Sequence, residues 1–265
     1  MPTAQVGGID LHYELAGQGP RLLFIGGTGG DLRHRPNVFD GPLASSFEVL
    51  AYDQRGLGRS GKPTPPYSMA EYGEDAARLL DAVGWETARV VGVSFGGMVA
   101  QELALRHPER VERLVLACTS SGGAGGASAP LHEYADLPPR ERALRQIAIG
   151  DLGCDEIWQR DNAAAVETLI EGILARQLPD DDHEGIAGAR GQLDARRWHD
   201  TWDRLPNLDV PTLVCGGRRD GIAPPPNLEA LASRIPGARL EFFDGGHLFL
   251  LQDPKAFGAI VDFLS

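Results

Sequence analysis

The stretch Gly92-Val93-Ser94-Phe95-Gly96-Gly97 joins a short apolar run, residues 90–93, to a segment with helical spacing of apolar residues. It has the pattern G-x-S-x-G in a strand–turn–helix setting, which presents a serine on a sharp turn. Glycines at positions 92 and 96 relieve crowding there. We therefore predict that Ser94 is a nucleophile and that the N–H of Phe95, at the helix N-terminus, faces developing negative charge. The alternative is a plain glycine turn in a chain with 34 glycines.

Strand and helix patterns alternate on both sides of this turn. Short apolar runs predict strands, and apolar residues spaced three to four apart predict helices. Predicted strands cover residues 9–15, 21–25, 47–52, 88–93, 111–118, 211–215 and 239–243, and predicted helices cover residues 68–83, 95–106, 228–234 and 254–264. This alternation is typical of an α/β fold, in which a mostly parallel sheet is flanked by helices.

The alternation stops after residue 120. Residues 122–130 are rich in glycine, alanine and serine, which predicts a loop. Residues 131–205 show helical patterns without a clear strand and contain three of the four tryptophans. We predict one α/β core, residues 1–120 and 206–265, with a helical cap, residues 121–205, inserted into it.

A serine hydroxyl needs a base, and the base needs a carboxylate to orient it. His247 follows the predicted strand 239–243, and Asp220 follows the predicted strand 211–215. The carboxyl ends of parallel strands lie at one edge of a sheet, so we expect both side chains to meet Ser94 there. The order Ser94, Asp220, His247 along the chain is the order typical of such a turn. Asp244, three residues before His247, is the alternative acid.

Composition limits the classes of partner. The 265-residue chain has a formal net charge of −12, which argues against a nucleic-acid partner. It has three widely spaced cysteines and no metal-ligand spacing, so we expect free thiols and no metal. A G-x-G-x-x-G match at residues 56–61 is followed by prolines at 63, 65 and 66, which prevent a helix; we expect no cofactor. Without a signal peptide or a membrane-length apolar run, a cytoplasmic location is expected. The oligomeric state stays open.

These motifs together resemble the α/β-hydrolase superfamily over essentially the whole chain. Residues 53–60, Asp-Gln-Arg-Gly-Leu-Gly-Arg-Ser, are similar to a D-x-R-G-x-G-x-S segment of that superfamily, and residues 92–103 look closest to 3-oxoadipate enol-lactonases and related small esterases. The resemblance implies an eight-stranded, mostly parallel sheet and an oxyanion hole formed by the N–H groups of Thr28 and Phe95. One position departs from the family: Gly26 stands where a histidine is usual.

The resemblance implies a hydrolase that cleaves a carboxylic ester or lactone of a small molecule through an acyl-serine. Cleavage of a carbon–carbon bond, perhydrolysis and aminopeptidase action use the same residues and stay open, as does a non-catalytic ligand-binding protein. Four further residues are candidates for substrate contact. Arg33 would bind a carboxylate or lie in a solvated turn. Trp158 would line an apolar pocket or pack within the cap. Gly27 directly precedes Thr28, and Leu248 directly follows His247.

Overall fold

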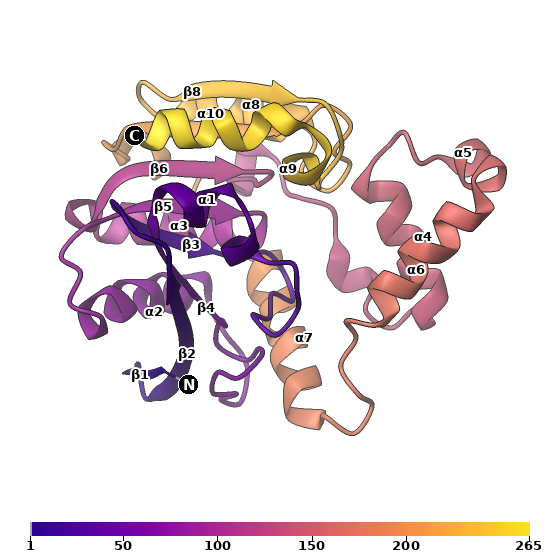
Figure 1. Cartoon of the computed structure of the whole chain (residues 1–265), viewed down its shortest axis with the longest axis horizontal. Coiled ribbons are helices and arrows are strands. Elements are labelled where there is room, and N and C mark those ends of the chain that lie inside the picture. The colour runs from indigo at the N-terminus through magenta and orange to yellow at the C-terminus, as the bar shows by residue number, and fades with distance from the viewer. Residues whose placement is uncertain (1) are drawn as a thin grey trace.

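The structure, a computed structural model, describes residues 2–265 and contains an eight-stranded sheet (Figure 1). The strand order is β1-β2-β4-β3-β5-β6-β7-β8. The strands are β1 Thr3–Val6, β2 Ile9–Ala16, β3 Arg21–Ile25, β4 Glu48–Tyr52, β5 Ala88–Val93, β6 Val111–Ala117, β7 Thr212–Gly217 and β8 Arg239–Phe243. Strands β1 and β2 pair antiparallel, β2 and β4 also pair antiparallel, and all later pairs are parallel. The predicted fold class is confirmed.

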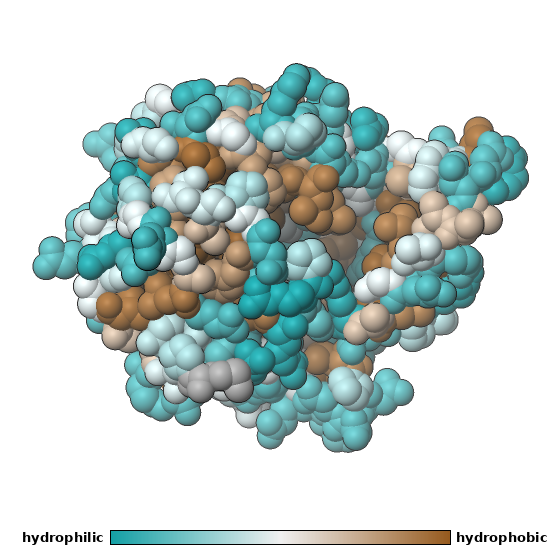
Figure 2. Space-filling model, in the orientation of Figure 1, coloured by the Kyte–Doolittle hydropathy of each residue, from teal (hydrophilic) through white to brown (hydrophobic). Residues whose placement is uncertain are grey.

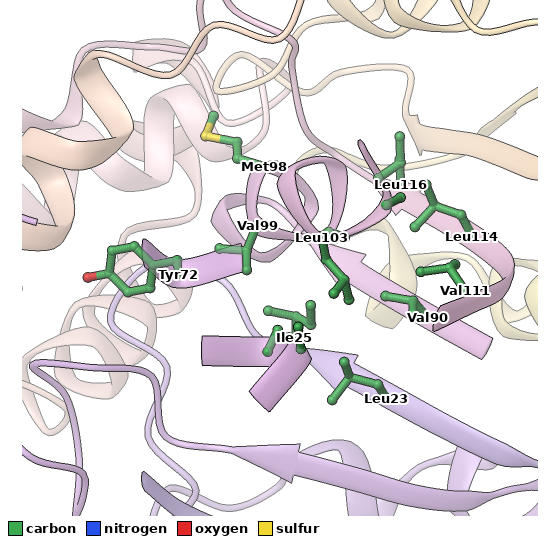
Figure 3. Close-up of a cluster of buried hydrophobic side chains, with 14 of the residues drawn as sticks. Leu23, Ile25, Tyr72, Val90, Met98, Val99, Leu103, Val111, Leu114 and Leu116 are labelled. Atoms are coloured by element: carbon green, nitrogen blue, oxygen red, sulfur yellow. The ribbon is translucent and has the colours of Figure 1, made fainter. Parts of the chain in front are cut away.

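Alternate residues of the parallel strands enter two separate hydrophobic clusters. Leu23, Val90 and Leu114 lie in the cluster that also contains residues of α2 (Met69–Ala82), α3 (Phe95–Arg106) and α8 (Pro225–Arg234). Their neighbours Leu22 and Val91 lie in the second cluster, with α1 (Pro42–Ser46) and α10 (Pro254–Leu264). Because successive side chains of a strand point to opposite faces, helices cover both faces of the sheet. Figure 3 shows part of the first cluster, where Val99 and Leu103 of α3 lie over Ile25 and Val90.

Most predicted elements agree with the structure within a few residues. The largest difference concerns the helix expected at 228–234, which begins at Pro225. Proline suits the first turn of a helix because its missing N–H would have no partner there, so the prolines at 225 and 226 lie inside the helix. Strand β1 also lies before the first predicted strand and pairs with it across the turn at residues 7 and 8.

Four α-helices lie between β6 and β7, in the span where the sequence predicts a cap. They are α4 (Pro139–Gly150), α5 (Glu156–Asp161), α6 (Ala163–Leu174) and α7 (His183–Arg197). Helices α4 to α6 form a group beside the sheet, whereas α7 lies nearer the core (Figure 1). The group has its own small core of Ala143, Ile147, Val166 and Ile170. Within residues 2–265, none of the helices combines the length and the apolar character needed to cross a membrane.

Candidate active site

Ser94 sits on a strained turn between β5 and α3. Its backbone has φ 55° and ψ −116°, a region that side chains other than glycine rarely adopt. A Cβ at Gly92 would lie 2.4 Å from the carbonyl oxygen of Gly96, and a Cβ at Gly96 would lie 2.0 Å from that of Ile25. Neither position accepts a side chain, because the contact in each case is rigid backbone. The two glycines thus allow the close approach that holds Ser94 at the end of the sheet.

Three side chains from separate loops form a connected hydrogen-bond chain. The Nε2 atom of His247 lies 2.9 Å from the Oγ atom of Ser94, and its Nδ1 atom lies 2.8 Å from Oδ2 of Asp220. Asp220 is fully buried, and its Oδ1 atom accepts the N–H groups of Ile222 at 2.7 Å and Ala223 at 3.0 Å. The carboxylate therefore has a fixed orientation toward the imidazole.

The alternative acid, Asp244, lies in a different environment. Asp244 is exposed, and its carboxylate makes no hydrogen bond or ion pair with any of residues 2–265. Its backbone N–H instead donates to Oδ2 of Asp253 at 2.9 Å. The geometry thus favours Asp220 as the partner of His247.

Two backbone N–H groups at this edge of the sheet have no acceptor among residues 2–265. Within residues 2–265, neither the N–H of Thr28 nor that of Phe95 donates a hydrogen bond. Phe95 is the first residue of α3, where N–H groups have no partner within the helix. Thr28 follows Gly27, at which a Cβ would lie 3.5 Å from the Cβ of Ser94. Both groups are therefore free to donate hydrogen bonds near Ser94, as the predicted oxyanion hole requires.

Two glutamines hold the loop that carries Thr28, and the sequence analysis missed both. Nε2 of Gln54 donates to the carbonyl of Gly26 at 2.9 Å, and the N–H of Gly29 donates to Oε1 of Gln192 at 2.8 Å. Gln54 follows β4 at the same sheet edge as Ser94, a position that the sequence pattern could have identified. Gln192 belongs to α7, one of the four α-helices between β6 and β7, which we call the insertion. Only the packing of the insertion against the core brings Gln192 to this loop.

The segment at residues 53–60 has a bracing role in this structure. The carboxylate of Asp53 accepts the N–H groups of Leu32 at 2.7 Å and Arg59 at 2.9 Å, which ties two loops together. Arg55 is buried and pairs with Asp75 of α2 through two contacts of 2.6 Å and 2.8 Å. In this structure the residues of the segment that resembles the family support the sheet edge, and they are not among the candidate reacting groups.

A large cavity of about 640 Å³ opens between the sheet edge and the insertion. Figure 2 shows this hollow, with hydrophobic surface on both sides of it. The cavity is lined by Gly27, Thr28 and Leu248, as well as by residues of α4 and of the end of α6. Ser94 and His247 are not themselves in its lining and lie just beyond Gly27 and Leu248. Two of the four predicted contact residues therefore border this space.

The other two predicted contact residues lie elsewhere. The guanidinium of Arg33 is engaged by its neighbour Asp31, with Nη2 and Oδ2 2.6 Å apart, and Arg33 does not line the cavity. Trp158 of α5 packs against the small core of the insertion. The contacts of both residues are those of the alternatives given for them, and substrate contact by either residue stays a prediction. Arg33 already has a carboxylate partner within the protein, and Trp158 takes the packing role that was its alternative.

One group of potential metal ligands coincides with this site. Among residues 2–265, the ligand atoms of Cys118, Asp220 and His247 lie within 4.8 Å of one another. Both ring nitrogens of His247 already have partners, and burial raises the pKa of the Cys118 thiol well above its ordinary value. A metal would need a free ring nitrogen and a thiolate. The arrangement instead suits transfer of a proton from Ser94 to His247.

The insertion also supports the loops that carry His247 and Asp220. The N–H of His247 donates to the carbonyl of Gly150 at 2.6 Å, and the N–H of Gly221 donates to that of Ile149 at 3.0 Å. Both carbonyls lie at the end of α4, where the last carbonyl groups of a helix lack partners within it. The end of α4 therefore helps to fix the loops on which the proton path depends.

Comparison with known proteins agrees with the fold. The family model for the alpha/beta hydrolase fold matches residues 20–146 and 172–254. A protein of Azorhizobium caulinodans named carbamate hydrolase RutD is 32% identical over 98% of this chain and 97% of its own. The poly(3-hydroxyalkanoate) depolymerase of Ectopseudomonas oleovorans is 32% identical over 91% of this chain and 82% of its own.

A solved structure extends the likeness to three dimensions. The enol-lactonase from Burkholderia xenovorans LB400 matches with a TM-score of 0.79 and 26% identity, over 99% of each chain. The resemblance inferred from the residues around Ser94 is thereby confirmed. The chain belongs to the family of hydrolases with the alpha/beta hydrolase fold.

Proposed function

We propose that this protein hydrolyses a carboxylic ester or lactone of a small molecule through an acyl-serine intermediate. The hydrogen-bond chain from Ser94 through His247 to Asp220, with separations of 2.9 Å and 2.8 Å, carries the proposal. It is supported by the relatives, which are named as hydrolases, one of them an enol-lactonase. A cavity of about 640 Å³ is of the size that binds small molecules.

In the first half of the reaction, Oγ of Ser94 attacks the carbonyl carbon as its proton passes to Nε2 of His247. The charge that develops on the carbonyl oxygen is held by the N–H groups of Thr28 and Phe95. The tetrahedral intermediate then collapses, the bond to the alcohol oxygen breaks, and His247 returns the proton to that oxygen. In the second half, water attacks the acyl group with His247 as base, and Ser94 is released with its proton. Asp220 stabilises the imidazolium in both halves.

Substitution of the nucleophile tests the proposal. We expect Ser94→Ala to lose hydrolysis of short aryl esters and simple lactones while its circular dichroism spectrum is retained. Ser233→Ala is the matched control, because Ser233 is exposed on α8 and bonds only to the helix carbonyl of Ala230. Equal rates for the Ser94 variant and the control would remove Ser94 from the mechanism.

A non-catalytic binding protein on the same fold is distinguished by covalent labelling. A fluorophosphonate labels a serine whose hydroxyl is activated by a neighbouring base that takes the proton as the oxygen attacks, so we expect one adduct, on Ser94. Hydrogen bonds from Gln54 and to Gln192 hold the loop of Thr28 within the protein itself, which supports a catalytic site. Unlabelled folded protein would favour the binding protein.

We also propose a cytoplasmic location. Cys118, Cys154 and Cys215 are all free, and free thiols persist in reducing compartments. Cell fractionation tests this, and recovery of the protein from an oxidising compartment would contradict it.

A further inference from the structure

A second, smaller cavity lies beside the nucleophile helix and contains a buried arginine. The cavity of about 100 Å³ lies between α3, the loop after β6 and the end of α7. Its polar lining comes from Ser120, Ser128, His132, Arg196, Arg197 and His199, and Met98, one turn after Ser94, lies on its wall. No function described above uses this space.

Arg196 is only 6% exposed, yet most of its guanidinium has no partner. Its Nη1 atom donates to the carbonyl of Ala129 at 2.6 Å. Its Nε and Nη2 atoms are buried and make no hydrogen bond with any residue from 2 to 265. Nε and one Nη are the pair that grips both oxygens of a carboxylate in a side-on contact. The two unused donors thus form half of a bidentate site.

No carboxylate among residues 2–265 pairs with this guanidinium. The residues that line the cavity include no aspartate or glutamate, and Glu133, next to the lining residue His132, lies 4.0 Å from that imidazole and is largely exposed. Burial by itself lowers the pKa of Arg196 to about 10, so the side chain is still a cation at neutral pH. A buried cation without a counter-ion is strongly unfavourable, and such a group calls for a ligand that balances it.

The remaining polar groups can act as hydrogen-bond donors. His199 is 5% exposed and neither of its ring nitrogens has a partner. Burial lowers its pKa to about 4, so the ring is neutral at pH 7 and has one N–H to donate. The hydroxyl oxygens of Ser120 and Ser128 lie 3.0 Å apart and share one hydrogen bond. That bond uses one of the two hydroxyl protons, so the other proton remains free to bind a ligand. The cavity therefore gathers the buried cation of Arg196, the more exposed cation of Arg197 and several neutral donors.

We propose that the cavity around Arg196 binds a small carboxylate, held side-on by Nε and Nη2 of Arg196 with His199 and the serine hydroxyls as further donors. The volume of the cavity is roughly that of three water molecules in the liquid. It therefore suits formate, acetate or the carboxylate end of a longer chain. The carboxylate is either a free ion or part of a substrate that also reaches Ser94.

Thermal unfolding in sodium formate and sodium acetate, against sodium chloride at equal ionic strength, tests the binding. We expect a saturable rise in melting temperature of a few degrees in the wild-type protein and in Ser94→Ala, which separates this test from the proposed reaction. Arg190→Met is the matched control, because Arg190 is exposed on the same helix, pairs with Asp136 and does not line the cavity. It should keep the rise, and Arg196→Met should lose it.

A second variant guards against a general effect of the Arg196 substitution. Ser128→Val narrows the cavity and keeps the guanidinium, and it should also reduce the rise. No saturable rise in the wild-type protein would overturn the proposal, because the cavity would then hold water alone. An equal rise in Arg196→Met would overturn it as well.

Kinetics separate the two sources of the carboxylate. A preference of the wild-type protein for an aryl hemisuccinate over an aryl pentanoate, at least tenfold in kcat/KM and lost in Arg196→Met, assigns the cavity to a substrate carboxylate. The same saturable rise without that preference assigns it to a free ion.

Discussion

The strain at Ser94 gives a prediction that does not depend on the substrate. With φ at 55° and ψ at −116°, the residue occupies a region that costs about 1–3 kcal/mol for a side chain with a Cβ. Alanine keeps this cost and glycine removes it. Glycine in turn loses about 0.5–1 kcal/mol through the greater freedom of its unfolded chain. We therefore expect Ser94→Gly to be about 1–2 kcal/mol more stable than Ser94→Ala.

The two variants are compared with each other because both lose the hydroxyl and its contact with His247. For a chain of this length, about 1–2 kcal/mol corresponds to a difference of roughly 2–6 °C in melting temperature. Calorimetry or unfolding followed by circular dichroism measures it, with the free energy in urea as a second measure. Neither variant should hydrolyse esters.

A matched pair at Ser233 supplies the control. Ser233 lies in α8 with a helical environment, so glycine should be less stable than alanine there, by up to about 1 kcal/mol. The sign should thus reverse between the two positions. If Ser94→Gly melted at or below Ser94→Ala, the strain described for this turn would be absent and the reasoning refuted.

Three further predictions concern the acid, the loop and a buried imidazole. Asp220→Asn should lower kcat by roughly 10³–10⁴-fold because the imidazole loses its orienting carboxylate, and Asp244→Asn should leave steady-state rates nearly unchanged; equal losses would contradict the assignment. Gln192→Leu, which removes the acceptor of the Gly29 N–H, should lower kcat about tenfold or more with little change in KM, and an unchanged kcat would show that this bond does not hold the oxyanion loop. Burial lowers the pKa of His199 to about 4 in the native state. Below pH 6.5 the imidazole is therefore protonated in the unfolded chain but stays neutral in the native state, so the free energy of unfolding falls as the pH drops. Between pH 7 and pH 5 the wild-type protein should lose about 2 kcal/mol more than His199→Gln in urea unfolding, and parallel losses would contradict the burial of a neutral ring.

The residues of the triad were predictable from sequence because each depends on a local pattern at the end of a strand. The glycine pattern of its turn identifies Ser94, and His247 and Asp220 each follow shortly after a predicted strand. Parallel pairing brings such positions to one edge whatever the rest of the chain does. Arg33 and Trp158 had no comparable support, since their surroundings depend on a loop and on the insertion.

The groups that the sequence did not predict lie where the insertion meets the core. Gln192 and Arg196 belong to a helix whose charged and glycine-rich sequence, residues 183–197, has no feature that indicates which face is buried. Its glycines decide the packing: a Cβ at Gly188 would lie 2.1 Å from the carbonyl of Gly56, so α7 rests directly on the segment after β4. A contact of that kind between backbones distant in sequence has no local signal.

The contacts between insertion and core also tie substrate selection to catalysis. A Cβ at Gly246 would lie 2.1 Å from the carbonyl of Gly150, so the loop of His247 passes directly against the end of α4. The same end of α4 accepts the N–H of His247, and residues of α4 line the large cavity. A substrate that shifts α4 would therefore move the base relative to Ser94, whose own position is fixed by the turn at β5. Because general-base catalysis falls steeply once the separation of Nε2 and Oγ exceeds hydrogen-bond distance, such a shift would change kcat as well as KM. In this architecture the fit of the substrate against the insertion is thus expected to act on the rate of the chemical step, and not on binding alone.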